Sequence, residues 1–330
     1  ATSLEVFHAF MLVHDDLIDA SSLRRGQPTL HEAIRLDEAG PDTPQRRKRA
    51  ADLGLIGGDL LYAIGLRMLA QASLPAESHV RATRQITAML LETGIGQTLD
   101  VLFDDCSLGE LKEADLVEAY VRKTSRYSVS GPLVLGAILA GAEESVCLSL
   151  QRFGDLLGFA YQVRNDLDSL EEDLKSGDHA DLDGGKRTFV LWTAYQFLEP
   201  AGRQALEEAL AAPVSVARRR LIRDLIAQSG AVPACNTRIE ASVREAVEAL
   251  SQSSLNEEQR QAFIALTGLF TPWAMALSLK LGTWNLTHSP GITALGLVEP
   301  ESFPLGDAVT LLVAQANSPS VNGTPSPDSV

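Results

Sequence analysis

Residues 14–31 read HDDLIDASSLRRGQPTLH, directly after a run rich in Phe, Leu and Val. The apolar spacing of that run predicts a helix over 3–19, which would place Asp15 and Asp19 one turn apart on one face, with Asp16 about 100° round. Carboxylates at this spacing repel each other and weaken a helix. A solvated helix end is one interpretation, and the lip of a pocket whose acids bind a cation is the other.

Two arginines, Arg24 and Arg25, follow the last of these acids after a short spacer. A guanidinium group presents paired donors to phosphate oxygens. Mg²⁺ is typically held by one or two protein carboxylates together with substrate phosphates. We therefore interpret 14–31 as a site at which acids hold metal ions, and the ions and arginines hold phosphate.

A second oxygen-rich face lies in YQVRNDLDSLEED, residues 161–173. On a helix, the four-residue spacing of Asn165, Ser169 and Asp173 brings these side chains to one face, which Asp166 flanks. A solvated helix end before a loop would explain this segment taken alone. Two such faces in one chain, each after a long apolar helix, favour a metal site.

Apolar residues recur at three- and four-residue spacing along most of the chain, and alternating β-rich runs are scarce. This pattern predicts an all-α fold, a single bundle of roughly ten or more helices. We expect one α-helical domain over 1–285 and a largely disordered C-terminal extension over 286–330, where the composition shifts to Ser, Pro, Asn and Gly. The expected helices are 3–19, 50–72, 79–105, 114–140, 148–175, 187–199, 203–211, 215–229, 236–251 and 256–283.

Charge and composition exclude several classes of partner. The formal net charge of −15 argues against nucleic acid or an anionic membrane surface. The sequence contains no apolar run of 18 residues, so we expect no membrane span. Three cysteines without regular spacing indicate reduced thiols in a cytoplasmic protein. The chain starts without Met and inside a helical pattern, so we expect that N-terminal helices are missing.

Seven blocks, in this order along the chain, resemble the trans-isoprenyl diphosphate synthase family, also called the polyprenyl synthetases. They are DDLIDASSLRRGQPTLH, GGDLL (57–61), GQTLD (96–100), RKTS (122–125), YQVRNDLDS (161–169), GGKRT (184–188) and SGA (229–231). The resemblance implies the isoprenoid synthase fold, with helices around a central apolar cavity, and a homodimer. It also implies Mg²⁺-dependent condensation of isopentenyl diphosphate with an allylic prenyl diphosphate, as in farnesyl and geranylgeranyl diphosphate synthases.

The resemblance also implies a set of metal ligands for three Mg²⁺ ions, the expected cofactor. The Mg²⁺ ions stabilise the negative charge that develops on the leaving diphosphate, so the C–O bond can ionise. An apolar cavity then protects the resulting allylic cation from water. The metal ligands carried over by position are Asp15, Asp16, Asp19 and Asp166, and the spacing of the second face adds Asn165, Ser169 and Asp173.

Substrate-binding roles are carried over in the same way. Arg24 matches a ligand of the allylic diphosphate, and Arg25 matches a ligand of isopentenyl diphosphate. Lys123 and Lys186 match lysines that contact the allylic diphosphate. Thr124 and Gln162 match positions near the nascent carbocation. Phe10, with Met11 beside it, matches the position that floors the product cavity and limits chain length, although ordinary core packing would also explain Phe10.

The second motif departs from the family pattern, because Asn165 replaces the first Asp and Ser169 replaces the third acid. Asn, Ser and Asp at four-residue spacing resemble the metal triad of class I terpene cyclases, which share the fold and the ionisation step but cyclise the prenyl chain. A cyclase is therefore the alternative function. A non-catalytic subunit of a heteromeric synthase is a third, disfavoured by the intact first motif and both lysines.

Overall fold

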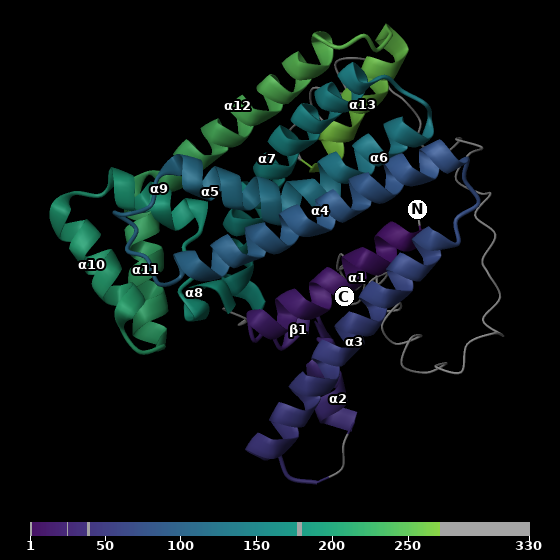
Figure 1. Ribbon diagram of the computed structural model, residues 1–330. Helices are drawn as coiled ribbons and strands as arrows, with labels where there is room; N and C mark the ends of the chain where they lie inside the picture. Colours follow the sequence, from purple (N-terminus) through teal and green to yellow (C-terminus); the bar gives the residue numbers. More distant parts are fainter. Residues whose placement is uncertain (1, 25, 38–39, 177–179, 271–330) are drawn as a thin grey trace, which may run out of the picture. The chain divides into compact units, whose positions relative to one another are not determined.

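The computed structural model describes residues 2–24, 26–37, 40–176 and 180–270, and the side chains at 171–181, 266 and 268–270 lie outside that description. Most of the described chain is helical (Figure 1). The all-α class predicted from the apolar spacing is confirmed. Two compact units are distinguished, one over Ala1–Ala72 and one over Ser73–Asn285, and each is described by itself. The extension predicted over 286–330 lies outside the described residues, so the domain division stays a prediction.

The first unit is built on two long helices that pack side by side, α1 and α3 (Figure 1). Its core contains Ala9, Val13, Leu30 and Leu61. Its elements are α1 (Thr2–Ile18), β1 (Leu23–Arg24), β2 (Gln27–Pro28), α2 (Leu30–Asp37) and α3 (Pro44–Ala70). Helix α3 begins where Thr43 caps it through its hydroxyl and Pro44 takes a first-turn position that needs no N–H donor.

Glycines on α3 let the two helices of the first unit approach closely. A Cβ at Gly65 would lie 2.7 Å from the ring of Phe7, and one at Gly58 would lie 2.3 Å from the ring of His14. No real Cβ tolerates such distances, so both contacts require the absence of a side chain. Gly58 of the GGDLL block is therefore explained by packing against α1, the helix that carries the first acidic motif, whereas Gly57 faces Leu30 of α2.

The second unit is organised around α7, which packs against α12, η1 and α6. One continuous apolar core runs through it and includes Phe153, Leu157 and Phe159, all fully buried. Its elements are α4 (Ala76–Phe103), α5 (Glu113–Tyr120), η1 (Val121–Ser130), α6 (Gly131–Leu139), α7 (Glu144–Ser176), α8 (Ala180–Gly184), α9 (Phe189–Phe197), α10 (Pro200–Ala211), α11 (Val216–Ser229), α12 (Ala231–Ser251) and α13 (Glu257–Phe270).

The segment η1 is wound as a π-helix, a form that is rare and concentrated at functional sites. It lies very close to two neighbours. A Cβ at Gly96 of α4 would be 2.2 Å from the backbone nitrogen of Lys123, and one at Gly158 of α7 would be 2.4 Å from Oγ of Ser125. The backbone of η1, which carries Lys123 and Thr124, is thus fixed between α4 and α7.

Most of the expected helices appear within a few residues of their predicted ends. The segment 114–140 is helical throughout but divides into α5, η1 and α6. The hairpin of β1 and β2 and the short helix α2 were not predicted, because each is too short to produce an apolar period. Residues 271–283 of the last expected helix lie outside the described residues.

In the part of the chain that the structure describes, α3 is the single helix long and apolar enough to cross a membrane, by length and composition alone. Its 18-residue window has a mean hydropathy of 1.5 and is 33% buried. The sequence does not show this stretch as one continuous apolar run, because Gly and Asp interrupt it. The expected absence of a membrane span stays a prediction.

Candidate active site

The first unit brings Asp15, Asp16 and Arg24 together. Nε of Arg24 donates to Oδ1 of Asp16 at 2.7 Å, and its Nη2 donates to Oδ2 of Asp15 at 3.0 Å. Asp16 is buried, with 5% of its surface exposed, and Asp19 is half-buried one turn further along α1. The last turn of the apolar helix and the hairpin thus converge on one cluster of charge, and the predicted roles of the acids in metal binding and of Arg24 in phosphate binding stay predictions.

The electrostatics of this cluster suit a cation. Burial is the largest influence on the pKa of Asp16 and raises it, Arg24 opposes the rise, and repulsion from Asp15 and Asp19 adds to it, for a value of about 6. Within the described residues, no group of three or more His, Cys, Asp or Glu side chains is gathered as a ready metal site. Mg²⁺ needs one or two carboxylates and completes its shell with water and phosphate, so the all-oxygen set of Asp15, Asp16 and Asp19 fits it.

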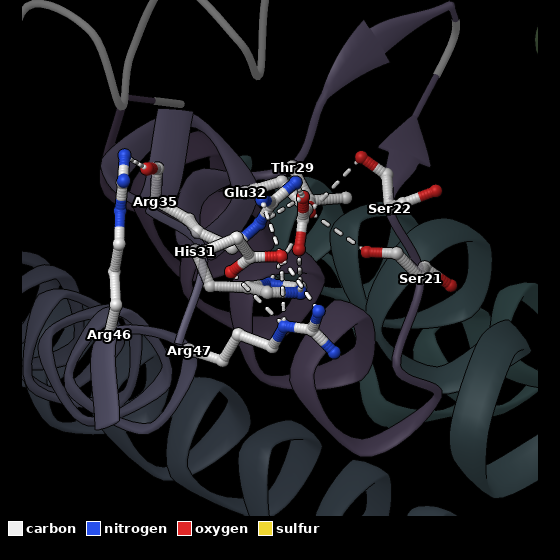
Figure 2. Close-up of polar contacts among 9 residues, drawn as sticks. Ser21, Ser22, Thr29, His31, Glu32, Arg35, Arg46 and Arg47 are labelled. Atoms are coloured by element: carbon white, nitrogen blue, oxygen red, sulfur yellow. Dashed lines mark hydrogen bonds and ion pairs between the residues drawn. The ribbon is translucent and has the colours of Figure 1, made fainter. Parts of the chain in front are cut away.

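Thr29 fixes the hairpin that presents Arg24. Its hydroxyl donates to the backbone carbonyl of Ser21 at 2.8 Å, and the Ser22 carbonyl lies at 3.4 Å (Figure 2). The backbone N–H of Thr29 also donates to the Ser22 carbonyl, at 3.1 Å. His31 Nδ1 lies 3.3 Å from the same hydroxyl. Thr29 is 1% exposed, so these contacts are shielded from water and hold the loop between the acids and Arg24.

A network of ion pairs joins α2 to the start of α3 (Figure 2). Arg35 donates twice to Glu32, at 2.9 and 2.6 Å, and lies 3.4 Å from Asp42. Asp42 also accepts from Arg47, at 2.7 Å, and Arg46 donates to the backbone carbonyl of Arg35. Arg46 and Arg47 of the RRKR segment, 46–49, therefore help to join α2 to the start of α3.

The two residues predicted to set product length lie on α1, and both are half-buried. The ring of Phe10 packs against Tyr62 of α3 at 5.2 Å and against His14 at 4.7 Å, centroid to centroid. These contacts agree with ordinary packing of α1 on α3 inside the first unit. The role of Phe10 and Met11 in a product cavity stays a prediction.

The second unit brings the two predicted diphosphate lysines to one carboxylate. Nζ of Lys123 lies 2.5 Å and Nζ of Lys186 lies 3.2 Å from Oδ2 of Asp100. Burial raises the pKa of Asp100, but the attraction of the two ammonium groups outweighs it and the net shift is downward. Lysines that are 63 residues apart in the sequence are therefore held around a single oxygen.

Arginines anchor the loop that carries Lys186. Arg187 donates to the backbone carbonyl of Cys106 at 2.9 Å. Arg218, which is 7% exposed, donates to the carbonyls of Ala209 at 2.9 Å and Asp183 at 3.3 Å. Arg219 forms a bidentate ion pair with the Asp183 carboxylate at 2.6 and 2.5 Å. The GGKRT block is thus fixed from both sides, which limits the positions open to the Lys186 side chain.

A chain of hydrogen bonds links three further predicted residues. The Thr124 hydroxyl donates to Oε1 of Gln162 at 3.0 Å, and Nε2 of Gln162 donates to Oδ1 of Asp166 at 3.0 Å. Oδ2 of Asp166 accepts from the Tyr120 hydroxyl at 2.5 Å. Burial, followed by the nearby charge of Asp166, raises the pKa of Tyr120 well above its usual range. Tyr120 therefore remains a donor.

The remaining predicted ligands are only partly placed. Asn165 and Ser169 are half-buried on α7, beside Asp166. Asp173 belongs to the same helix, but its side chain lies outside the described residues, as does Arg25. The metal-binding role of Asn165, Ser169 and Asp173 stays a prediction, as does the role of Arg25 in binding isopentenyl diphosphate.

Sequence reasoning missed two members of the site. Asp100 ends the GQTLD block, which carried the family resemblance, so an acid at a fixed place in a motif was the available signal. Tyr120 precedes RKTS and belongs to no motif. No pattern along the chain could have found Tyr120, because its partners Asp166 and Phe189 are 46 and 69 residues away.

Comparison with known proteins finds relatives over more than half of the chain. The family model for polyprenyl synthetase matches residues 1–225. A geranylgeranyl diphosphate synthase from Sulfolobus acidocaldarius is 30% identical over 214 residues, 63% of this chain and 59% of that protein. A geranylfarnesyl diphosphate synthase from Aeropyrum pernix is 27% identical over 267 residues, 76% of this chain and 74% of that protein.

A solved structure extends the likeness to the fold. The geranylgeranyl pyrophosphate synthase from Corynebacterium glutamicum, complexed with isoprenyl diphosphate and magnesium, gives a TM-score of 0.70 at 27% identity. The match covers 81% of this chain and 76% of that chain. The predicted isoprenoid synthase fold is therefore confirmed. With a family model that spans more than half of its length, the chain belongs to the polyprenyl synthetase family.

Proposed function

We propose that this chain is a prenyl diphosphate synthase that condenses isopentenyl diphosphate with an allylic prenyl diphosphate, with Mg²⁺ as cofactor. The matched segment spans 59% of the length of the Sulfolobus relative. Family membership supports the proposal, and so do the names of the relatives. The observation that carries it is the pair of lysines around Asp100, next in sequence and space to the Thr124–Gln162 pair.

The lysine pair suits a diphosphate. Because both ammonium groups reach one oxygen of Asp100, they are close enough to contact one diphosphate group together. Their positive charge stabilises the negative charge that grows on the diphosphate as the allylic C–O bond breaks. Arg24, described within the first unit, carries a guanidinium of the kind that binds phosphate in a bidentate way.

The Thr124–Gln162 pair suits the other product of ionisation, the allylic carbon. The amide oxygen of Gln162 and the hydroxyl oxygen of Thr124 carry partial negative charge and no titratable proton. Thr124 is 7% exposed and Gln162 is half-buried. Oxygens of this kind stabilise a developing cation without trapping it as a covalent adduct. The C3=C4 double bond of isopentenyl diphosphate then attacks the cation, so that its C4 bonds to C1 of the allylic group. The released diphosphate takes the C2 proton, and a C2=C3 double bond forms in the longer diphosphate.

The acids Asp15, Asp16 and Asp19 would hold the cofactor. Bound Mg²⁺ would supply Lewis-acid stabilisation of the leaving diphosphate. The protein's own contribution there is to keep carboxylates at the end of α1 in a partly buried setting, where they attract a cation strongly.

Asn165 and Ser169 favour a second candidate, a class I terpene cyclase. Both present neutral oxygens from α7 where the family usually has acids. Such a cyclase would ionise the same kind of substrate without consuming isopentenyl diphosphate. The relatives reported above are synthases by name, which favours elongation.

One incubation separates these functions. Purified protein is given Mg²⁺ and labelled farnesyl or geranylgeranyl diphosphate, with and without isopentenyl diphosphate. Longer diphosphates that form only when isopentenyl diphosphate is present support the proposal. Hydrocarbons formed without it identify a cyclase. Absence of both products in a folded protein contradicts both functions and favours the subunit interpretation.

A double variant adds a second criterion. Asn165→Asp combined with Ser169→Asp moves the motif toward the acid-rich family pattern. A synthase should keep or raise its elongation rate, whereas a cyclase loses product because two added charges change how metal and diphosphate are held. Collapse of elongation in the folded double variant contradicts the synthase proposal.

We further infer a homodimer in the cytoplasm. On α4, Leu91, Ile95 and Leu102 fall on one face at helical spacing, and 65%, 37% and 56% of their surfaces are exposed. A second copy would cover such a face. The three cysteines are free thiols, which agrees with a reducing compartment. Sedimentation equilibrium tests the dimer, and a monomer at micromolar concentration contradicts it.

A further inference from the structure

Tyr120 is a buried residue that lies outside the seven sequence blocks and yet contacts the candidate site. It ends α5, immediately before η1, and 6% of its surface is exposed. Its ring packs near Phe159, with 6.1 Å between centroids. Its hydroxyl accepts from the backbone N–H of Phe189 at 2.8 Å and lies 2.5 Å from Oδ2 of Asp166.

These two contacts fix the direction of the hydroxyl proton. The N–H of Phe189 can only donate, so the hydroxyl oxygen of Tyr120 is its acceptor. The single proton of the hydroxyl is then directed at Asp166, whose carboxylate accepts it. Because Phe189 is the first residue of α9, directly after the GGKRT block, Tyr120 ties Asp166 to a rigid element.

Asp166 in turn fixes the side-chain amide of Gln162. Its second oxygen, Oδ1, accepts from Nε2 of Gln162 at 3.0 Å. A carboxylate offers acceptors only, so the nitrogen end of the amide must face it and the oxygen end must face the opposite way. On that side Oε1 accepts from the Thr124 hydroxyl at 3.0 Å and retains a second lone pair.

We propose that Tyr120 is a positioning residue: through Asp166 it holds the Gln162 amide in the one orientation that turns oxygen, and not the NH₂ group, toward the reacting allylic carbon. The role rests on the proposed function. A reversed amide would place partial positive charge beside a developing cation and oppose ionisation. Correct orientation therefore matters in the transition state more than in substrate binding.

Loss of the Tyr120 hydroxyl should weaken this series of hydrogen bonds without leaving a cavity in the core. Tyr120→Phe keeps the ring against Phe159, but Phe189 loses its acceptor and Asp166 loses one donor. The carboxylate is then held from fewer directions, and the amide of Gln162 can sample both orientations. The variant should show a lower kcat, by about 10- to 100-fold, with the KM for the allylic diphosphate within about twofold of wild type.

The matched control is Tyr195→Phe. Tyr195 is a half-buried tyrosine of the same unit, on α9, whose ring lies under the Arg203 guanidinium at 5.4 Å. Deleting its hydroxyl should leave both kcat and KM unchanged. Circular dichroism and thermal unfolding of each variant report whether the fold is kept.

A double-mutant cycle with Gln162→Ala decides whether Tyr120 acts through Gln162. If it does, Tyr120→Phe should change kcat by less than about twofold in the Gln162→Ala background. An equal loss in both backgrounds would overturn the role, since a merely structural defect does not depend on the amide. Wild-type kcat in folded Tyr120→Phe would overturn it as well.

Tyr120→Leu, which also removes the hydroxyl, replaces Tyr120→Phe in the same cycle if the latter fails to fold. The same dependence on Gln162 is expected, and independent losses would again overturn the role. Failure of the proposed function is seen separately, as a wild-type protein that produces no longer diphosphate.

Discussion

Replacing Gly96 by Ala tests how the candidate lysine and threonine are positioned. Gly96 lies on α4, in the GQTLD block, and its Cα faces the backbone of η1. The added Cβ would lie 2.2 Å from the Lys123 nitrogen and 2.6 Å from the Lys123 Cα. Ordinary contact begins at 3.4 Å, so the two helices must separate locally by about 1.2 Å, the difference between 3.4 and 2.2 Å. Backbone atoms cannot rotate away as a side chain can.

Two opposing energies set the size of the effect. Overpacking a tight contact costs about 1–3 kcal/mol, and a backbone clash belongs at the upper end. Ala is favoured over Gly inside a helix by about 1 kcal/mol, which offsets part of that cost. We expect Gly96→Ala to lower the free energy of unfolding by about 1–2 kcal/mol.

Gly94→Ala is the control, because a Cβ there has no neighbour within 4 Å. It keeps the gain in helix propensity without the clash, so this variant should be more stable than wild type by up to about 1 kcal/mol. Urea unfolding of the pair should therefore give a gap of about 2–3 kcal/mol between two substitutions two residues apart.

Turnover should separate the same two variants. A shift of η1 by about 1 Å displaces Lys123 and Thr124 together, and misplacement on this scale can cost about 100-fold in rate. Gly94→Ala should keep wild-type turnover. Equal stability of the two variants, or full turnover in Gly96→Ala, would refute the inference that η1 is held directly against α4.

Other predictions concern single side chains. The two lysines lower the pKa of Asp100, so its carboxylate stabilises the fold above its unfolded pKa of 3.8, and that contribution is lost as the pH falls through the lower folded value. The difference in unfolding free energy between wild type and Asp100→Asn should therefore be full at pH 7 and shrink below about pH 4. A difference that does not depend on pH contradicts the ion pairs. Asp15→Ala should abolish nearly all turnover and the rise in melting temperature on adding Mg²⁺, while circular dichroism stays unchanged; turnover that survives in EDTA contradicts the metal role. Phe10→Ala should shift products to longer chains if Phe10 floors the cavity, as chromatography of the dephosphorylated products would show, whereas an unchanged distribution in an active variant returns Phe10 to ordinary packing against Tyr62.

Local sequence was sufficient to predict the longer helices and to locate the first acidic motif. The apolar period of α1 places Asp15 and Asp16 at its end, and a short spacer places Arg24 a few residues further along the chain. Their meeting at 2.7 and 3.0 Å is therefore nearly dictated by covalent connection. The hairpin between them was missed, because strands of two residues produce no period to detect.

Contacts between distant segments were decided only by the tertiary structure. The sequence marked Lys123 and Lys186 as cations in motifs, but their shared partner, Asp100, depends on how α4, η1 and the loop after α8 pack together. Tyr120 shows this limit most plainly, since its hydroxyl meets Asp166 and Phe189 across the core and no periodic pattern records such a meeting. Sequence by itself determined the longer helices and marked most of the residues predicted to do the chemistry, because periodicity and residue type are local properties. Tertiary packing alone decided which of those residues touch, because side-chain contacts depend on helix approaches that glycines such as Gly96 permit and that no local rule encodes.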